Sequence, residues 1–365
     1  MKQDWRTLPF EKSIVKVKYT TKIASTDYLK SGLYPIISQE EGLINGYWNN
    51  EKDVFKVYSP IIVFGDHTRI LKYVDFDFVI GADGVKILQP INKINAKFLK
   101  YYIESCRIPS LGYSRHYKLL KKISVPIPPM IEQERIVAEL DLLSDVIAKK
   151  REQLKQLDTL AQSIFYDMFG DPIINEKGWK TKKLGEISTS QIGITYKPED
   201  VSDNGMGTVV LRSGNIQNSS LCFNDIIKVN KDIREDKYVK DGDILMCSRN
   251  GSFQLVGKVA MITTLKERMT YGAFMTVIRS DYQPFLFAFF KSPAFRSQLT
   301  TAKTATINQI TIRMLENMQV ILPPLTLQQE FASKIEAIEK QKELIKQSLS
   351  EVQQLFDSRM DYYFG

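Results

Sequence analysis

Several short loops of this 365-residue sequence combine glycine with the side chains that read base edges in DNA. Arginine and lysine match the acceptors of guanine, asparagine and glutamine match adenine, and glycine permits close backbone approach. For each residue a structural role in a turn, or a phosphate contact without sequence information, is the alternative. The candidate DNA contacts are His67, Thr68, Arg69, Tyr113, Ser114, Arg115, His116, Arg212, Asn215, Gln217, Ser248, Arg249, Asn250, Ser252, Asn308 and Gln309.

Motifs for catalysis are scarce. Both Pro-Pro pairs follow Ile127 or Leu322, so neither forms the Asn/Asp-Pro-Pro-Tyr/Phe motif of amino-methyltransferases. Neither a Gly-x-Gly-x-x-Gly nor a Gly-x-x-x-x-Gly-Lys-Ser/Thr loop occurs, so we expect no cofactor or nucleotide site. Asp225, Glu235 and Lys237 offer the residue types of a magnesium-dependent nuclease. They lie in a stretch of mixed charge that favours a solvated turn.

The composition does not favour a metal site, a disulfide framework or a membrane span. Cys106, Cys222 and Cys247 lack Cys-x-x-Cys spacing, and the only histidines are His67 and His116. Neither a disulfide framework nor a structural zinc site is expected. The N-terminal residues show no apolar leader, and no stretch approaches the roughly 20 apolar residues of a membrane span. We therefore expect a cytoplasmic protein without a membrane partner.

Positive charge is unevenly distributed along the chain. Fifty basic residues against 42 acidic ones give a net charge of +8. Residues 1–127 carry a surplus of eight positive charges and residues 171–322 a surplus of five. Residues 128–170 and 323–365 are slightly acidic, by three and two charges. Two basic segments with acidic spacers indicate a polyanionic partner such as duplex DNA.

The two acidic segments are copies of one another. Residues 128–170 align without a gap on residues 323–365, and eight positions are identical. Each copy opens with Pro-Pro, which suits a helix start, and ends in Phe-Gly. The repeat predicts a long helix in each segment.

A heptad pattern of apolar residues continues through both predicted helices, with Lys150, Lys342 and Arg359 as interruptions. Such a seam favours coiled-coil packing, with separate amphipathic helices as the alternative. Because the first helix joins the two basic segments, the second buries its seam by running back along the first, which makes the pair antiparallel. The predicted seam residues are Leu140, Leu143, Ile147, Leu154, Leu157, Ile335, Ile338, Ile345, Leu349 and Val352.

The two basic segments are expected to be α+β domains. Runs such as 60–64, 77–80 and 207–211 predict strands, and 96–102 predicts a helix. The predicted domains are residues 1–127 and 171–322, with long helices at 128–170 and 323–365. Two tandem α/β domains joined by an antiparallel two-helix coiled coil would have an approximate two-fold axis, matching a ligand with its own dyad.

Over nearly its whole length, the chain resembles the DNA-specificity subunits of bacterial type I restriction-modification systems. The first domain departs from the family opening, with Phe10-Glu11 in place of Leu-Gly. The motifs that carry the resemblance are Pro128-Pro129-x-x-x-Gln133 and Pro323-Pro324-x-x-x-Gln328, the Ser-Ile-Phe-x-x-x-Phe-Gly ending at 163–170, and the Trp-x-x-x-x-Leu-Gly-x-Ile opening at 179–187.

The resemblance implies that each domain is a target-recognition domain for one half of a split asymmetric DNA site. It implies that the helices dock two methyltransferase subunits and set the unread spacer, and that this chain is not an enzyme and binds no cofactor. In the family, S-adenosylmethionine is bound by the modification subunits, and ATP with magnesium by the restriction subunits that translocate DNA. The alternatives are a DNA-bridging protein without a methyltransferase partner and a self-sufficient nuclease.

Overall fold

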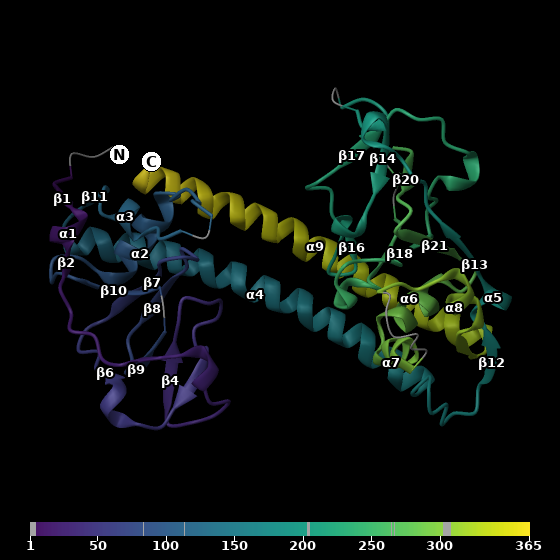
Figure 1. The fold of residues 1–365 in the computed structure, drawn as a ribbon, viewed down its shortest axis with the longest axis horizontal. Coiled ribbons are helices and arrows are strands. Elements are labelled where there is room, and N and C mark those ends of the chain that lie inside the picture. Colours follow the sequence, from purple (N-terminus) through teal and green to yellow (C-terminus); the bar gives the residue numbers. More distant parts are fainter. Residues whose placement is uncertain are drawn as a thin grey trace. The chain divides into compact units, whose positions relative to one another are not determined.

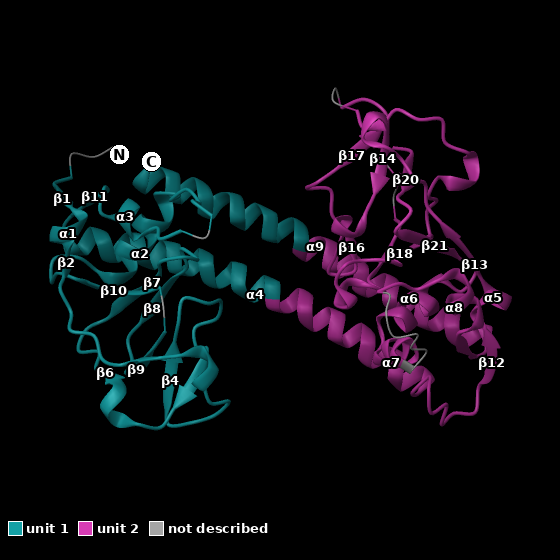
Figure 2. Ribbon diagram, viewed as in Figure 1, with its two compact units in different colours: residues 1–151, 346–365 teal, residues 152–345 magenta. Residues whose placement is uncertain are grey.

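The computed structural model describes residues 5–82, 84–112, 114–202, 205–263, 265, 267–301 and 308–365. It divides into unit 1, residues 1–151 with 346–365, and unit 2, residues 152–345 (Figure 2). Two helices of 40 residues, α4 (Met130–Phe169) and α9 (Leu325–Phe364), each contribute to both units. Each long helix begins directly after a Pro-Pro pair. Among the described residues, no helix has the length and apolarity needed to cross a membrane.

Unit 1 contains two sheets and a short ribbon (Figure 1). The antiparallel sheet has the order β2-β10-β7-β8, formed by Ile14–Val15, Val85–Pro90, Ile61–Gly65 and Leu71–Val74. The mixed sheet has the order β3-β9-β4-β5, with β6 also on β9, formed by Lys22–Ile23, Phe78–Gly81, Tyr34–Ile37, Gly46–Trp48 and Val54–Phe55. The ribbon pairs β1 (Thr7–Pro9) with β11 (Ser124–Pro126). The helices besides α4 and α9 are α1 (Phe10–Ser13), α2 (Ala96–Ser105) and α3 (Tyr117–Leu120).

Unit 2 repeats this plan with different lengths. Its antiparallel sheet has the order β13-β21-β18-β19, formed by Thr189–Ile192, Met275–Arg279, Ile244–Cys247 and Val259–Met261. A smaller sheet has the order β17-β14-β20, formed by Ile227–Val229, Thr208–Leu211 and Met269–Tyr271. Two ribbons pair β12 (Lys180–Lys183) with β22 (Gln319–Leu322) and β15 (Ile216–Gln217) with β16 (Ser220–Leu221). The short helices are α5 (Leu184–Ile187), α6 (Gln283–Lys291), α7 (Pro293–Thr301) and α8 (Ile312–Asn317).

The openings of the two units are equivalent in structure. Phe10 and Leu184 each begin a one-turn helix directly after the ribbon strand, and both are fully buried. The backbone N–H of Phe10 donates to Ile123 O, and that of Leu184 donates to Met318 O. Phe10 thus takes the place of Leu184, which accounts for the departure from the Leu-Gly motif in the first segment.

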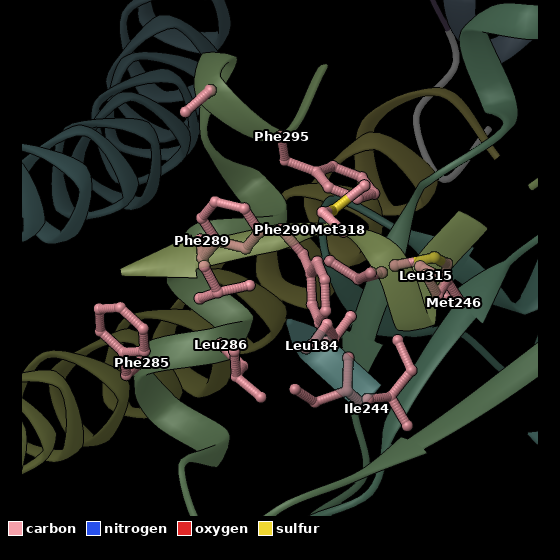
Figure 3. Packing of buried hydrophobic residues seen from close by; sticks show 14 of the residues in the cluster. Leu184, Ile244, Met246, Phe285, Leu286, Phe289, Phe290, Phe295, Leu315 and Met318 are labelled. Atoms are coloured by element: carbon pink, nitrogen blue, oxygen red, sulfur yellow. The ribbon is translucent and has the colours of Figure 1, made fainter. Parts of the chain in front are cut away.

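The Phe-Gly ending of each long helix closes the core of one unit. In unit 2, Phe169 of α4 lies 5.0 Å from Phe285 of α6 and 5.1 Å from Phe331 of α9, measured between ring centroids. Phe285 belongs to a cluster of apolar side chains from α6, α5 and α8 (Figure 3). In unit 1, Phe364 of α9 lies 5.5 Å from Phe98 of α2, whose helix packs on β7 and β8. The phenylalanine of the repeated ending therefore packs in the core of each unit.

A buried glutamine fixes the start of each long helix. Gln133 Nε2 donates to Pro128 O, and Gln328 Nε2 donates to Pro323 O. Gln133 Oε1 also accepts the N–H of Asn95, which caps α2. The repeated Pro-Pro-x-x-x-Gln motif therefore holds the turn into the helix by a side-chain bond to its own first proline.

The ten predicted seam residues are all buried or half-buried. Leu140, Ile147 and Ile338 have at most 6% of their surface exposed. Leucines off the seam, such as Leu142 and Leu344, are more than half exposed. Burial thus follows the heptad positions, while the coiled-coil register stays a prediction. The local predictions of strands near 61–65, 78–81 and 208–211 and of a helix from Ala96 are confirmed.

Candidate nucleic-acid interface

In unit 1, two of the loops selected from the sequence are held together by Asp66 and His116. The backbone N–H of His116 donates to Asp66 O at 2.8 Å, and its ring Nδ1 lies 2.9 Å from the same oxygen. Because a carbonyl oxygen only accepts, Nδ1 carries the proton, and Nε2 accepts the N–H of Leu111 at 2.9 Å. The Asp66 carboxylate accepts the N–H of Tyr117 at 2.7 Å. His116 is fully buried, so its ring positions the loops and is not a candidate base contact.

A third segment joins these loops through Gln39, which the sequence analysis did not select. Gln39 Oε1 accepts the N–H of His67, and Gln39 O accepts the hydroxyl of Thr68. Arg69 has a φ of +64° and donates through Nη1 to Ile108 O at 2.9 Å. The loop after β7 is therefore fixed from both sides before any ligand binds.

The remaining candidates of unit 1 differ in exposure. Thr68, Arg69 and Arg115 are exposed, and His67 and Ser114 are half-buried. Tyr113 lies outside the described residues. The side chains open to a ligand thus come from the loop after β7 and from the segment before α3.

In unit 2, the loop after β14 is organised by Asn215. This side chain is 2% exposed, and its Oδ1 accepts the N–H of Arg212 at 2.8 Å. Its Nδ2 donates to Cys222 O and to Asp225 O. Asn215 therefore closes the loop from inside, as His116 does in unit 1. Arg212 forms an ion pair with Asp225 at 2.8 Å, and Gln217 remains exposed.

A second structural residue, Ser248, ties the loop after β18 to its neighbours. Its hydroxyl and its backbone N–H both donate to Phe274 O, at 3.0 and 2.9 Å. Its carbonyl accepts the N–H of Ile310 at 2.7 Å, which brings in the segment before α8. Ser248 is 4% exposed, so this hydroxyl positions the loop.

Asn250 and Asn308 complete the cluster of unit 2. Asn250 Nδ2 donates to Ser213 Oγ at 3.2 Å, and its Oδ1 accepts the N–H of Ser252. Asn308 Nδ2 donates to Gly251 O at 2.8 Å. The three loops selected from the sequence of this domain thus lie side by side, with Gln309 bridged to Arg249.

The sequence analysis also missed Phe274, which lies in the turn between β20 and β21. Its ring is 57% exposed, and the guanidinium carbon of Arg249 lies 5.2 Å from the ring centroid. In the sequence, this phenylalanine reads as part of the apolar run that forms β21. A phenylalanine two positions after Gly272 was the available signal.

A buried lysine lies behind the loops of unit 1. Lys72 of β8 is 6% exposed, and its Nζ donates to Ser38 O and to Asn45 Oδ1, both at 2.8 Å. Burial lowers the pKa of Lys72 to about 8, against the opposing charge of Glu40. The segment that Lys72 anchors leads directly into Gln39.

The three residues of the nuclease alternative are each bonded to a different partner. Asp225 binds Arg212, Glu235 binds Arg268, and Lys237 Nζ donates to Ile192 O at 2.7 Å. In the part of the chain that the structure describes, no three His, Cys, Asp or Glu side chains are close enough to hold a metal ion.

The chain belongs to the family of the type I restriction modification DNA specificity domain, whose model matches residues 8–158 and 176–354. It is 27% identical over 283 residues to the EcoKI specificity subunit of Escherichia coli K12, covering 69% of this chain and 60% of that one. It is 21% identical to the MjaVIII specificity subunit of Methanocaldococcus jannaschii, covering 97% and 92%. The chain thus spans only part of some relatives' length.

The fold is also shared with a solved structure. The crystal structure of the type I restriction-modification S subunit from M. genitalium superimposes with a TM-score of 0.60. The match covers 98% of this chain and 96% of that one at 13% sequence identity. At this identity the likeness concerns the fold, a pair of domains with mixed helix and sheet content.

Proposed function

We propose that this chain is the sequence-specific DNA-binding specificity subunit of a type I restriction-modification complex. Each recognition domain reads one half of a split asymmetric site. The observation that carries the proposal is the repeated placement of polar loops in a common topology. In both units, the loop after the strand β7 or β18 is bonded to the segment before the short helix α3 or α8. The family membership supports the same assignment.

The two recognition domains are residues 1–127 and 171–322, and the long helices are residues 128–170 and 323–365. We propose that α4 and α9 form an antiparallel coiled coil, which gives the chain an approximate two-fold axis. At 1.5 Å per residue, a straight helix of 40 residues is about 60 Å long. That length corresponds to about 17 to 18 base pairs, an outer limit for the separation of the two half-sites.

The helices also dock two methyltransferase subunits in this proposal, and restriction subunits join the same complex. This chain acts by binding DNA and by positioning its partners, and it is not itself an enzyme. S-adenosylmethionine belongs to the modification subunits, and ATP with magnesium to the restriction subunits. We expect the complex in the cytoplasm, where its DNA is found.

Methylation mapping tests this proposal directly. DNA is sequenced by a long-read method from cells that express the modification subunit with this chain and from cells that lack this chain. A split asymmetric adenine-methylated motif that requires this chain is the expected result. Methylation that is absent, or that does not depend on this chain, would overturn the proposal and leave a DNA-bridging protein as the better description.

A further inference from the structure

Unit 2 contains seven arginines among its described residues. Of these, only Arg249 lies in the loops described above and has no carboxylate partner among the described residues. Arg313 also has no carboxylate partner among the described residues, but it lies on α8, outside the loops. An arginine needs free donors to bind the O6 and N7 acceptors of guanine. The others are committed: Arg212, Arg234, Arg268 and Arg279 each bind a carboxylate, and Arg296 donates to the carbonyl oxygens of Val256 and Gln254.

The backbone of Arg249 is fixed from two sides. Its N–H donates to Phe274 O at 3.1 Å, and the residue forms an antiparallel bridge with Gln309. The neighbouring Asn250 N–H donates to Asn308 O at 3.3 Å. The residue is therefore part of a small extension of the sheet and not of an unrestrained loop.

The side chain of Arg249 is guided by an aromatic ring. Its guanidinium carbon lies 5.2 Å from the centroid of Phe274, and no ion pair competes for it among the described residues. A planar guanidinium can stack on a ring while its edge donors point outward, which lysine cannot do. The ring thus positions the exposed guanidinium, and among the described residues no group accepts a hydrogen bond from it.

We propose that Arg249 reads a guanine in the half-site bound by unit 2, with Phe274 as a positioning residue for its guanidinium. The inference rests on the proposed function and specifies one nucleobase of the recognised half-site. A bidentate contact from arginine to guanine discriminates against other bases, whereas a phosphate contact would not.

The test is Arg249→Lys, which keeps the positive charge and removes the planar pair of donors. The variant is co-expressed with the modification subunit, and its methylated motif is mapped. We expect discrimination at one guanine position of one half-site to fall by about 5- to 150-fold, with the other half-site unchanged. Arg313→Lys is the matched control, since it changes an exposed arginine of the same unit and should leave the motif intact.

Phe274→Leu separates positioning from folding. It should relax the same guanine position, and adding it to Arg249→Lys should cause little further relaxation. A thermal melt of each variant complex checks that the fold is retained. A purely structural role for Phe274 would lower the melting temperature without relaxing that position.

Selection of bound sites from a random duplex pool provides a second readout that does not require methylation. An intact guanine position in the Arg249→Lys motif, with binding weakened equally for all sequences, would show a phosphate contact and overturn the inference alone. If the wild-type complex selects no sequence and methylates none, the proposed function fails as well.

Discussion

At the scale of the residue, His116 shows how burial decides the role of a polar side chain. Both of its ring nitrogens are engaged within unit 1, by Asp66 O and by Leu111 N–H. His116→Ala would leave both groups without partners, and we expect it to lower the free energy of unfolding of this unit by about 2 to 4 kcal/mol. Urea denaturation measures this loss.

The neighbouring Arg115 provides the control for His116. Arg115 is exposed, so Arg115→Ala should change the free energy of unfolding by less than about 0.5 kcal/mol. If His116→Ala unfolded at the same urea concentration as Arg115→Ala, the structural role of the imidazole would be refuted.

Lys72 makes the stability of unit 1 depend on pH. Its pKa falls from 10.5 to about 8 on folding, so the folded state holds this proton less tightly than the unfolded chain. Keeping Lys72 charged in the folded state therefore lowers the free energy of unfolding. This loss is present in full below pH 8 and disappears as the pH rises toward 10.5. Relative to Lys72→Met, the wild type should therefore gain stability over this range, by at most about 1.4 kcal/mol per pH unit.

The comparison is made by urea denaturation of both proteins at several pH values. Groups shared by the two proteins cancel in the difference, which isolates Lys72. A difference in unfolding free energy that stays flat between pH 8 and 10.5 would contradict a depressed lysine pKa.

The candidate loops could be selected from residue types, but the roles within them could not. His116 and Asp66 are 50 positions apart, and Asn250 bonds to a serine 37 positions away. Local sequence does not show which amide or imidazole will be satisfied by a distant backbone group. The sequence therefore placed His116, Asn215 and Ser248 with the exposed residues, although all three are buried.

At the scale of the element, the long helices were the most predictable part of the chain. The heptad spacing of their apolar residues, their Pro-Pro starts and their Phe-Gly ends are local features of the sequence. The same features occur in both segments, which strengthened the prediction. The short strands of the mixed sheets were less predictable. Phe274, in the turn between β20 and β21, was equally hard to assign, because an aromatic residue beside a strand gives no sign of whether it faces the core or a ligand.

Lys342, an interruption of the predicted seam, forms an ion-paired cluster in unit 2. Its Nζ lies 3.0 Å from Asp158 Oδ1 and 2.8 Å from Glu339 Oε1, and Lys291 Nζ lies 3.6 Å from the same aspartate oxygen. Burial opposes the charge of Lys342, but the bonds to Glu339 and Asp158 raise its pKa, whereas burial lowers the pKa of Lys291. The Asp158 carboxylate thus pairs with two ammonium groups, of which Lys342 is buried and Lys291 is half-buried.

Asp158→Ala removes that carboxylate and leaves Lys342 and Lys291 facing each other. We expect it to lower the free energy of unfolding of unit 2 by about 1 to 3 kcal/mol, measured by urea denaturation. Adding Lys342→Met should restore most of the loss. Glu330→Ala breaks the exposed pair with Lys334 and should cost less than about 0.5 kcal/mol. Equal effects of Asp158→Ala and Glu330→Ala would argue against a buried cluster.

At the scale of the whole molecule, the common topology of the units makes them exchangeable in principle. Both modules begin with a ribbon strand and a buried residue of a short helix, and both end at a strand before Pro-Pro. Their helix-facing cores differ at several positions of the repeat. Among them, unit 1 has Ile136 and Met360 where unit 2 has Phe331 and Phe165. A chimera should therefore carry Ile136→Phe and Met360→Phe, because Phe165 packs on both Phe331 and Phe285 in unit 2, with ring centroids 5.9 and 5.6 Å apart.

We predict that replacing residues 1–127 with a second copy of residues 171–322 converts the methylated motif into a palindrome. The physical reason is that both halves of the site would be read by the same loops, presented on equivalent strands. Methylation mapping of the chimera with the modification subunit measures the outcome, and the half-site that disappears is assigned to residues 1–127. A chimera that assembles and still methylates the original asymmetric motif would show that base reading does not reside in these modules.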